Sequence, residues 1–190
     1  MNEKTISSKR VFDGRLLKLD VLEVELDNGR RSRREIVRHP GAVAVWARTP
    51  EGQLLFVRQF RKAVEGALLE IVAGTLDAGE SPAACAIREI SEETGCEVKT
   101  LTPLGFIHTA PGFCGERLEL FVAELAPSGT GQTPRDAGRV PLTGQPHPDP
   151  DEMLDVVWLS RDEWEAKVVS GEIHDAKSLA AWALVQAQKL

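Results

Sequence analysis

The sequence predicts a fold that mixes strands with a few helices, α+β or α/β, in which strands predominate early in the chain. Apolar and polar residues alternate over several short segments before residue 75, as in strands that bury one face. A helical pattern replaces this alternation between residues 81 and 94, and again after residue 160. With 190 residues, of which 42% are hydrophobic and 27% charged, we expect one compact domain, or a main domain with a small annex.

Three extended segments begin the chain. In the second segment Leu17, Leu19 and Val21 alternate with charged residues, which predicts a half-buried strand. The turn dipeptide Asn28-Gly29 follows it, so the second and third segments are expected to form a β-hairpin. The expected strands are residues 5–14, 16–26 and 31–39.

The remaining elements follow from the same signals. Ser81 suits a helix N-cap and Pro82 the first helical position, while Gly95 suits the end of that helix. The other expected strands are residues 41–48, 53–61, 68–74, 104–109, 117–125 and 153–160, and two further helices cover 161–170 and 175–190. Residues 126–150 contain six Pro and four Gly, which is typical of a functional or partly disordered loop.

The helix over residues 82–94 carries an acidic cluster. On a helical wheel Ile87, Ile90 and Ala83 form a stripe that we expect to be buried. The three glutamates of this helix cluster on the opposite side; they are Glu89, Glu92 and Glu93. Such a face can be a solvated surface, but converging carboxylates can also bind Mg²⁺ or Mn²⁺, because these hard cations prefer oxygen ligands.

The spacing around this helix resembles the Nudix box. The pattern is Gly, five residues, Glu, seven residues, the run REISEE, one residue and Gly. Its fixed positions are Gly74, Glu80, Arg88, Glu89, Glu92, Glu93 and Gly95. Cys96 departs from the aliphatic residue that is usual in the family, and a buried thiol substitutes for it as a small hydrophobe.

The resemblance to the Nudix family implies a mixed sheet between helices, an α/β/α sandwich, with the box as a loop, a helix and a loop. It implies that Glu89 and Glu93 are the main metal ligands, that Glu92 assists, and that the carbonyl of Ala73 contributes. Arg88 would orient the acidic face. The activity implied is hydrolysis of compounds in which a nucleoside diphosphate is linked to another group.

Further segments resemble the ADP-ribose pyrophosphatase branch of that family. Pro111 follows Gly95 by sixteen residues, as in that branch, and "RREIVRHPGAVAV", "VRQFR" and "GEIHDAKSLAAW" are also similar to it. By this resemblance Arg34, Arg61 and Glu116 are candidates to contact the substrate, with Arg61 suited to the diphosphate. Phe12, Arg15 and Phe113 remain open alternatives for stacking on the base.

In this branch a carboxylate outside the box activates the attacking water. Asp149, Asp151 and Glu152 precede the strand expected at 153–160, and Glu152 is our candidate by its offset from that strand. We therefore expect Mg²⁺-dependent hydrolysis of ADP-ribose to AMP and ribose 5-phosphate, with Glu93 and Glu152 as catalytic residues. The alternatives are hydrolysis of another nucleoside diphosphate sugar such as GDP-mannose, and a non-catalytic module that senses ADP-ribose.

The resemblance also divides the chain into an antiparallel β annex, residues 1–40, and a Nudix domain, residues 41–190. The annex of this branch is exchanged between subunits, so a homodimer is expected. The net charge of −6 argues against nucleic acid as a partner. No apolar run is long enough for a membrane span, and three cysteines without a CxxC pair fit a cytoplasmic protein.

Overall fold

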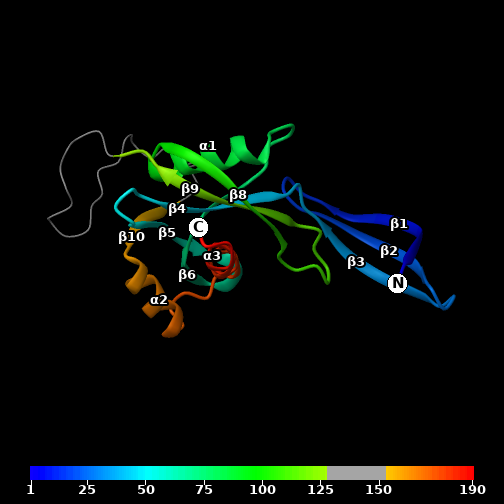
Figure 1. Cartoon of the computed structure of the whole chain (residues 1–190). Helices are drawn as coiled ribbons and strands as arrows, with labels where there is room; N and C mark the ends of the chain where they lie inside the picture. The colour runs from blue at the N-terminus through cyan, green and yellow to red at the C-terminus, as the bar shows by residue number, and fades with distance from the viewer. Residues whose placement is uncertain (128–152) are drawn as a thin grey trace. The chain divides into compact units, whose positions relative to one another are not determined.

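A computed structural model describes residues 1–127 and 153–190, and these divide into two compact units. The annex unit comprises Met1–Gly41 together with His108–Leu118, and the main unit comprises Ala42–Ile107 together with Glu119–Leu190. The segment 108–118 is far from the N-terminus in sequence, so its assignment to the annex unit depends on tertiary contacts. Figure 1 shows the elements along the chain.

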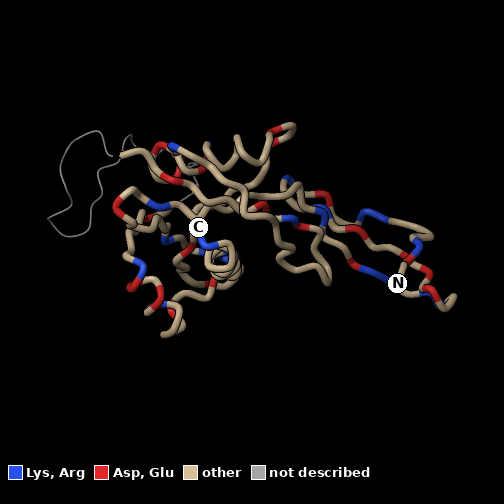
Figure 2. Tube along the Cα trace, in the orientation of Figure 1, with Lys and Arg blue, Asp and Glu red and all other residues tan. Residues whose placement is uncertain are grey.

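The annex unit is a three-stranded antiparallel sheet in the order β1-β2-β3. Its strands are β1 (Glu3–Asp13), β2 (Lys18–Leu26) and β3 (Arg31–Arg38), in agreement with the three expected segments. Charged residues of both signs lie along these strands (Figure 2). The segment 108–118 joins β3 through two backbone hydrogen bonds, from Val37 N to Phe113 O (2.8 Å) and from Gly115 N to Val37 O (3.0 Å).

The main unit contains a seven-stranded sheet. Its central order is β10-β5-β4-β9-β8, with β6 paired to β5 and β7 to β4. These strands are β4 (Ala42–Arg48), β5 (Leu54–Arg61), β6 (Gly66–Glu70), β7 (Val72–Thr75), β8 (Val98–His108), β9 (Arg117–Leu125) and β10 (Leu154–Leu159), with a 3-10 turn η1 (Lys62–Val64) after β5. β4 and β5 form the expected antiparallel hairpin across residues 49–52.

The single strand expected at residues 68–74 is in fact two strands. Ile71 separates β6 from β7, and its backbone N–H donates to the Ser178 hydroxyl (3.0 Å) instead of to a neighbouring strand. β6 then pairs with β5 and β7 with β4, so the chain changes partner at this residue. Periodicity alone could not indicate this break, because Leu69 and Glu70 before it and Val72 after it are all buried.

Helices cover both faces of the sheet, as the α/β/α expectation requires (Figure 1). α1 (Pro82–Thr94) covers one face, where the hydrophobic core includes Val43, Val45 and Val57. α2 (Arg161–Val169) and α3 (Ala176–Gln188) cover the other. There Trp164 stacks on Phe56 (ring centroids 4.9 Å apart) and meets Trp46 edge to face at 5.0 Å.

The expected orientation of α1 was wrong. Ile87 is 47% exposed and Ala83 is also exposed, whereas Glu89 and Glu93 are only 9% and 4% exposed. Ile90 is fully buried, as expected. α1 therefore buries the carboxylates of Glu89 and Glu93 and leaves Ile87 exposed. The orientation of this helix is thus not determined by the burial of apolar side chains alone.

No helix in the described parts of the chain has both the length and the apolar composition needed to span a membrane.

Candidate functional site

The segment 74–96 folds as a loop, a helix and a loop. The Ser81 hydroxyl caps α1 by accepting a hydrogen bond from Ala84 N (3.2 Å), and Pro82 occupies the first turn. Gly95 ends the helix with φ +66°, a left-handed conformation that glycine adopts without strain. These local signals set the limits of the helix that carries the acidic residues.

The guanidinium of Arg88 lies among three carboxylates. It donates to both oxygens of Glu80 (Nε–Oε1 2.9 Å, Nη2–Oε2 3.0 Å). Its Nη1 lies 2.9 Å from Glu92 Oε2 and 2.8 Å from Glu89 Oε1. Because one cation faces three anions, the cluster retains excess negative charge.

The pKa values reflect this cluster. The hydrogen bonds from Arg88 lower the pKa of Glu80 from 4.5 to about 2, and those with Glu80 raise the pKa of Arg88. Burial raises the pKa of the Cys85 thiol from 9.0 to about 12, so this thiol stays protonated and packs as a small apolar group. Glu80 and Arg88 are therefore both ionised at neutral pH.

Gly74 provides the space for Glu89. A Cβ at position 74 would lie 1.9 Å from both Cδ and Oε1 of Glu89, so only glycine leaves room for the carboxylate. β7 carries Gly74 and Ala73 and is hydrogen-bonded to β4 at the centre of the sheet. The close approach at Gly74 thus places Glu89, one of the four expected metal ligands, against the strand that also carries Ala73, another of them.

These residues fit a divalent cation in their chemistry. Two of the carboxylates are nearly buried, and carboxylate and carbonyl oxygens are the ligands that Mg²⁺ and Mn²⁺ prefer. In residues 1–127 and 153–190, however, no three His, Cys, Asp or Glu side chains already form a metal-binding group. Glu89 and Glu92 instead contact Arg88, so a cation would compete with this guanidinium for them.

Arg61, the residue expected at the diphosphate, lies at the end of β5. Its Nε and Nη2 donate to the two carboxylate oxygens of Glu70 (2.9 and 2.7 Å), and hydrogen bonding to Glu70 raises its pKa. The negative charge of Glu93 also contributes to this shift. Arg61 therefore lies within electrostatic range of the acidic helix.

The two other expected substrate contacts belong to the annex unit, and both have partners there. Arg34 forms a bidentate ion pair with Glu3 of β1 (Nε–Oε2 3.0 Å, Nη2–Oε1 2.6 Å). Glu116 accepts a hydrogen bond from the Thr109 hydroxyl (2.6 Å) and lies 3.6 Å from Nδ1 of His39. Glu152, the expected general base, lies outside the described residues, as do Asp149, Asp151 and residues 128–150 of the long loop.

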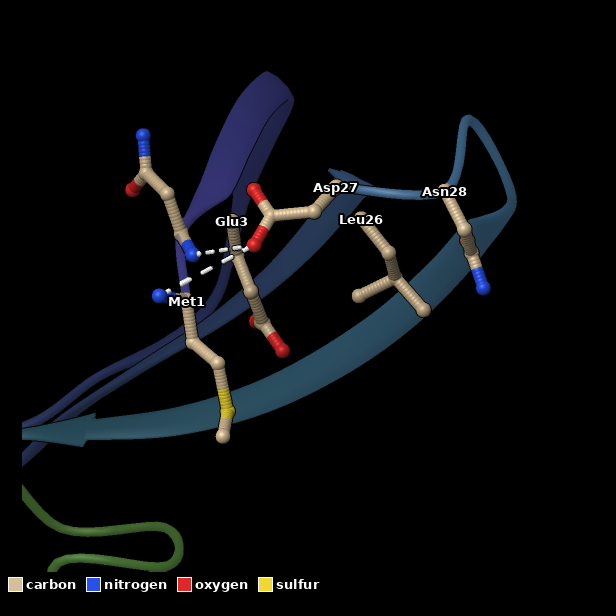
Figure 3. Close-up of a pocket in the computed structure, with 6 residues that line it drawn as sticks. Met1, Glu3, Leu26, Asp27 and Asn28 are labelled. Carbon is tan, nitrogen blue, oxygen red and sulfur yellow. Dashed lines mark hydrogen bonds and ion pairs between the residues drawn. The ribbon is translucent and has the colours of Figure 1, made fainter.

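A pocket of about 390 Å³ lies at the end of the β2–β3 hairpin (Figure 3). It is lined by residues 1–3 and 26–28, and the Asp27 carboxylate in it accepts a hydrogen bond from Asn2 N (2.9 Å). None of these residues was a site candidate, and all belong to the annex unit, whereas the acidic helix belongs to the main unit.

The sequence analysis missed two charged residues next to Arg61. Glu70 is only 1% exposed, and Lys177 forms an ion pair with it from α3. Glu70 had a visible signal, because it is the one charged residue in the apolar stretch "ALLEIVAG". A buried carboxylate in such a stretch requires a cationic partner, but the sequence does not indicate which one.

Comparison with known proteins identifies a family and its relatives. A family model described as the NUDIX domain matches residues 37–182. A methanol dehydrogenase activator of Bacillus methanolicus is 41% identical, over 98% of this chain and 94% of that protein. An ADP-ribose pyrophosphatase of Bacillus subtilis is 40% identical, over 95% of this chain and 91% of that protein. Relatives named GDP-mannose pyrophosphatase are 32% and 30% identical.

The fold is similar to that of a solved structure described as an ADP compounds hydrolase. The TM-score is 0.77, over 99% of this chain and 94% of that chain, at 22% sequence identity. This likeness confirms the expected α/β/α architecture with its N-terminal strands.

Proposed function

The chain belongs to the Nudix family, and we propose that it hydrolyses the diphosphate of ADP-ribose to AMP and ribose 5-phosphate. The observation that carries the proposal is the intact box, in which Glu89 and Glu93 are nearly buried. Glu89 fills the space beside Gly74, and the negative charge of Glu93 acts on Arg61. The similarity to an ADP-ribose pyrophosphatase over almost the whole chain supports ADP-ribose as the substrate.

A divalent cation, with Mg²⁺ as our choice and Mn²⁺ as a substitute, would be held by Glu89, Glu92, Glu93 and the carbonyl of Ala73. When bound, such an ion polarises the phosphoryl oxygens and offsets the charge that develops on them. The contribution of the protein is to hold these oxygen donors on a rigid element. The Ser81 cap and the Glu80–Arg88 ion pair both attach α1 to the loop that precedes it.

The remaining residues divide between binding and water activation. Arg61 would bind the diphosphate, because a guanidinium matches the geometry of phosphate oxygens. Arg34 and Glu116 would contact the nucleoside or ribose groups. Each of them would then exchange a present partner, Glu3 or Thr109, for substrate. Glu152 would orient and deprotonate the attacking water.

We propose a homodimer as the active assembly. All eleven residues of β1 are exposed, including Val11 and Phe12, although this strand carries apolar side chains. A second copy that covers this strand would bury them. Light scattering tests this proposal, and an active protein of monomer mass would contradict it.

A cytoplasmic location is part of the proposal and is supported by three free cysteines in the described residues.

The first experiment is turnover with Mg²⁺ against ADP-ribose, GDP-mannose, UDP-glucose, NADH and 8-oxo-dGTP. A phosphatase that acts only on the released monophosphates reports most products, and direct nucleotide detection serves 8-oxo-dGTP. Preference for ADP-ribose supports the proposal. Preference for GDP-mannose would leave the proposed metal site unchanged and would contradict ADP-ribose as the substrate. Binding of ADP-ribose without turnover would favour the alternative of a non-catalytic module that senses ADP-ribose.

A further inference from the structure

The segment "GEIHDAKSLAAW", residues 171–182, contains the start of α3, and none of the functions above accounts for it. Asp175 caps this helix by accepting hydrogen bonds from the backbone and the hydroxyl of Ser178 (3.0 and 2.5 Å). The same hydroxyl accepts from Ile71 N, at the break between β6 and β7. The first turn of α3 is thereby attached to the strand residue that follows Glu70.

Lys177 extends from this turn to Glu70. Its Nζ donates to Glu70 Oε2 and to Asp175 Oδ1, the latter at 3.0 Å. Glu70 is only 1% exposed, so its charge requires close cationic partners, and Lys177 and Arg61 are the two that the described residues provide. The four residues form a neutral group of two cations and two anions.

The contact between Glu70 and Arg61 fixes the plane of the guanidinium. Both carboxylate oxygens accept from one edge of Arg61, the edge formed by Nε and Nη2. A two-point contact of this kind removes the rotation that a lysine ammonium would retain. The Arg61 side chain is nevertheless 42% exposed, so it remains accessible to a bound anion.

We infer that Glu70 and Lys177 are positioning residues, which hold Arg61 in the orientation that binds the substrate diphosphate. This inference rests on the proposed function. Lys177 acts by balancing the buried charge of Glu70, and Glu70 acts by orienting Arg61. The α3 segment is thus connected to the diphosphate through three consecutive contacts, from Asp175 to Lys177, Glu70 and Arg61.

A double-mutant cycle tests the inference. Glu70→Gln keeps the shape of the side chain and removes its charge, and it is measured in the native protein and in an Arg61→Met background. In the native background we expect kcat/KM for ADP-ribose to fall about 10- to 100-fold, because a misplaced binding group costs this much. In the Arg61→Met background the same change should have less than about a threefold effect, because no guanidinium remains to be positioned.

The same cycle is repeated with binding of ADP in the presence of Mg²⁺, measured by calorimetry, which requires no turnover. The coupling between positions 70 and 61 should appear in both measurements. If the protein binds ADP with this coupling but does not hydrolyse ADP-ribose, the proposed function fails and the positioning role stands. If Glu70→Gln weakens ADP binding equally in both backgrounds, or in neither, the positioning role is wrong. Absence of ADP binding overturns both.

Two further variants separate positioning from folding. Glu124→Gln is the matched control, because Glu124 accepts from Arg48 (2.6 Å) in the same sheet and has no place in the site. It should change kcat/KM less than about twofold. Lys177→Met leaves the Glu70–Arg61 contact in place and should lower kcat/KM less than Glu70→Gln does. Should Glu70→Gln fail to fold, the cycle is run with Lys177→Met, whose effect must also vanish in the Arg61→Met background.

Discussion

Replacement of Gly74 by alanine should abolish most of the activity and leave the protein folded. The added Cβ would lie 1.9 Å from the Cδ and Oε1 atoms of Glu89, and real Cβ contacts are essentially never closer than 3.0 Å. The carboxylate must therefore move by at least about 1.1 Å. Since Gly74 does not adopt a positive φ, backbone strain is not part of this effect.

The expected losses of stability and of activity both follow from the displacement of the Glu89 carboxylate. The clash involves the end of a flexible side chain, so the protein can relax, and we expect a loss of about 1 kcal/mol in the free energy of unfolding, the lower end for overpacking. A displacement of about 1 Å in a catalytic group can lower the rate about 100-fold, equivalent to about 2.7 kcal/mol of barrier. Activity should therefore fall much more than stability.

The assay is ADP-ribose turnover over a range of Mg²⁺ concentrations, combined with urea unfolding. Gly66→Ala is the control, because its Cβ would meet only Val64 O at 3.7 Å. We expect Gly74→Ala to need more Mg²⁺ and to remain slow at saturation, with Gly66→Ala close to the native protein. A folded Gly74→Ala protein with native kcat/KM and Mg²⁺ requirement would refute the placement of Glu89 at the metal.

Three other predictions concern the box and the core. Glu93→Gln should lower turnover about 100-fold or more at saturating Mg²⁺, while the unfolding midpoint stays close to that of the native protein; a near-native rate would remove Glu93 from the metal site. The pKa of Glu80 lies at about 2 instead of 4.5, so its stabilising contribution is complete above about pH 4.5 and is lost as the pH falls toward 2. Urea unfolding of the native protein and Glu80→Gln should thus converge between pH 4.5 and 2, and a difference that stays constant with pH would contradict the ion pair with Arg88. Trp164→Ala should lower the free energy of unfolding by about 3–5 kcal/mol, because Trp164 is fully buried against Trp46 and Phe56; a loss below about 1 kcal/mol in urea would show that this cluster does not support the sheet.

Local signals were sufficient to locate the helix of the box. The prediction from Ser81, Pro82 and Gly95 agrees with the observed α1, Pro82–Thr94. These residues act within a few positions of themselves, through a side-chain cap, a fixed φ and a left-handed φ, so no distant part of the chain is needed. The spacing of the glutamates, and with it the family, was readable for the same reason.

The orientation of that helix required the tertiary structure. The wheel predicted a buried Ile87 and an acidic face turned away from the core, whereas Ile87 is exposed and Glu93 is buried. Periodicity separates two faces of a helix but does not state which neighbours each face meets. Here the glycine at position 74 provides space for a carboxylate beside the sheet, and that contact joins two elements.

By itself, then, the sequence determined most of the strands, the boundaries of α1 and the acidic composition of the site, because each depends on residues close together in the chain. It did not indicate the break at Ile71 or the start of β8 at Val98, six residues before the strand expected at 104–109. Only the tertiary structure decided that Glu70 and Lys177, which are 107 positions apart, share a buried ion pair beside Arg61. It also decided that residues 108–118 join the annex unit. Such contacts arise when the whole sheet is assembled, because a buried charge is tolerated only where an opposite charge meets it, and that partner comes from a distant part of the chain that no local pattern records.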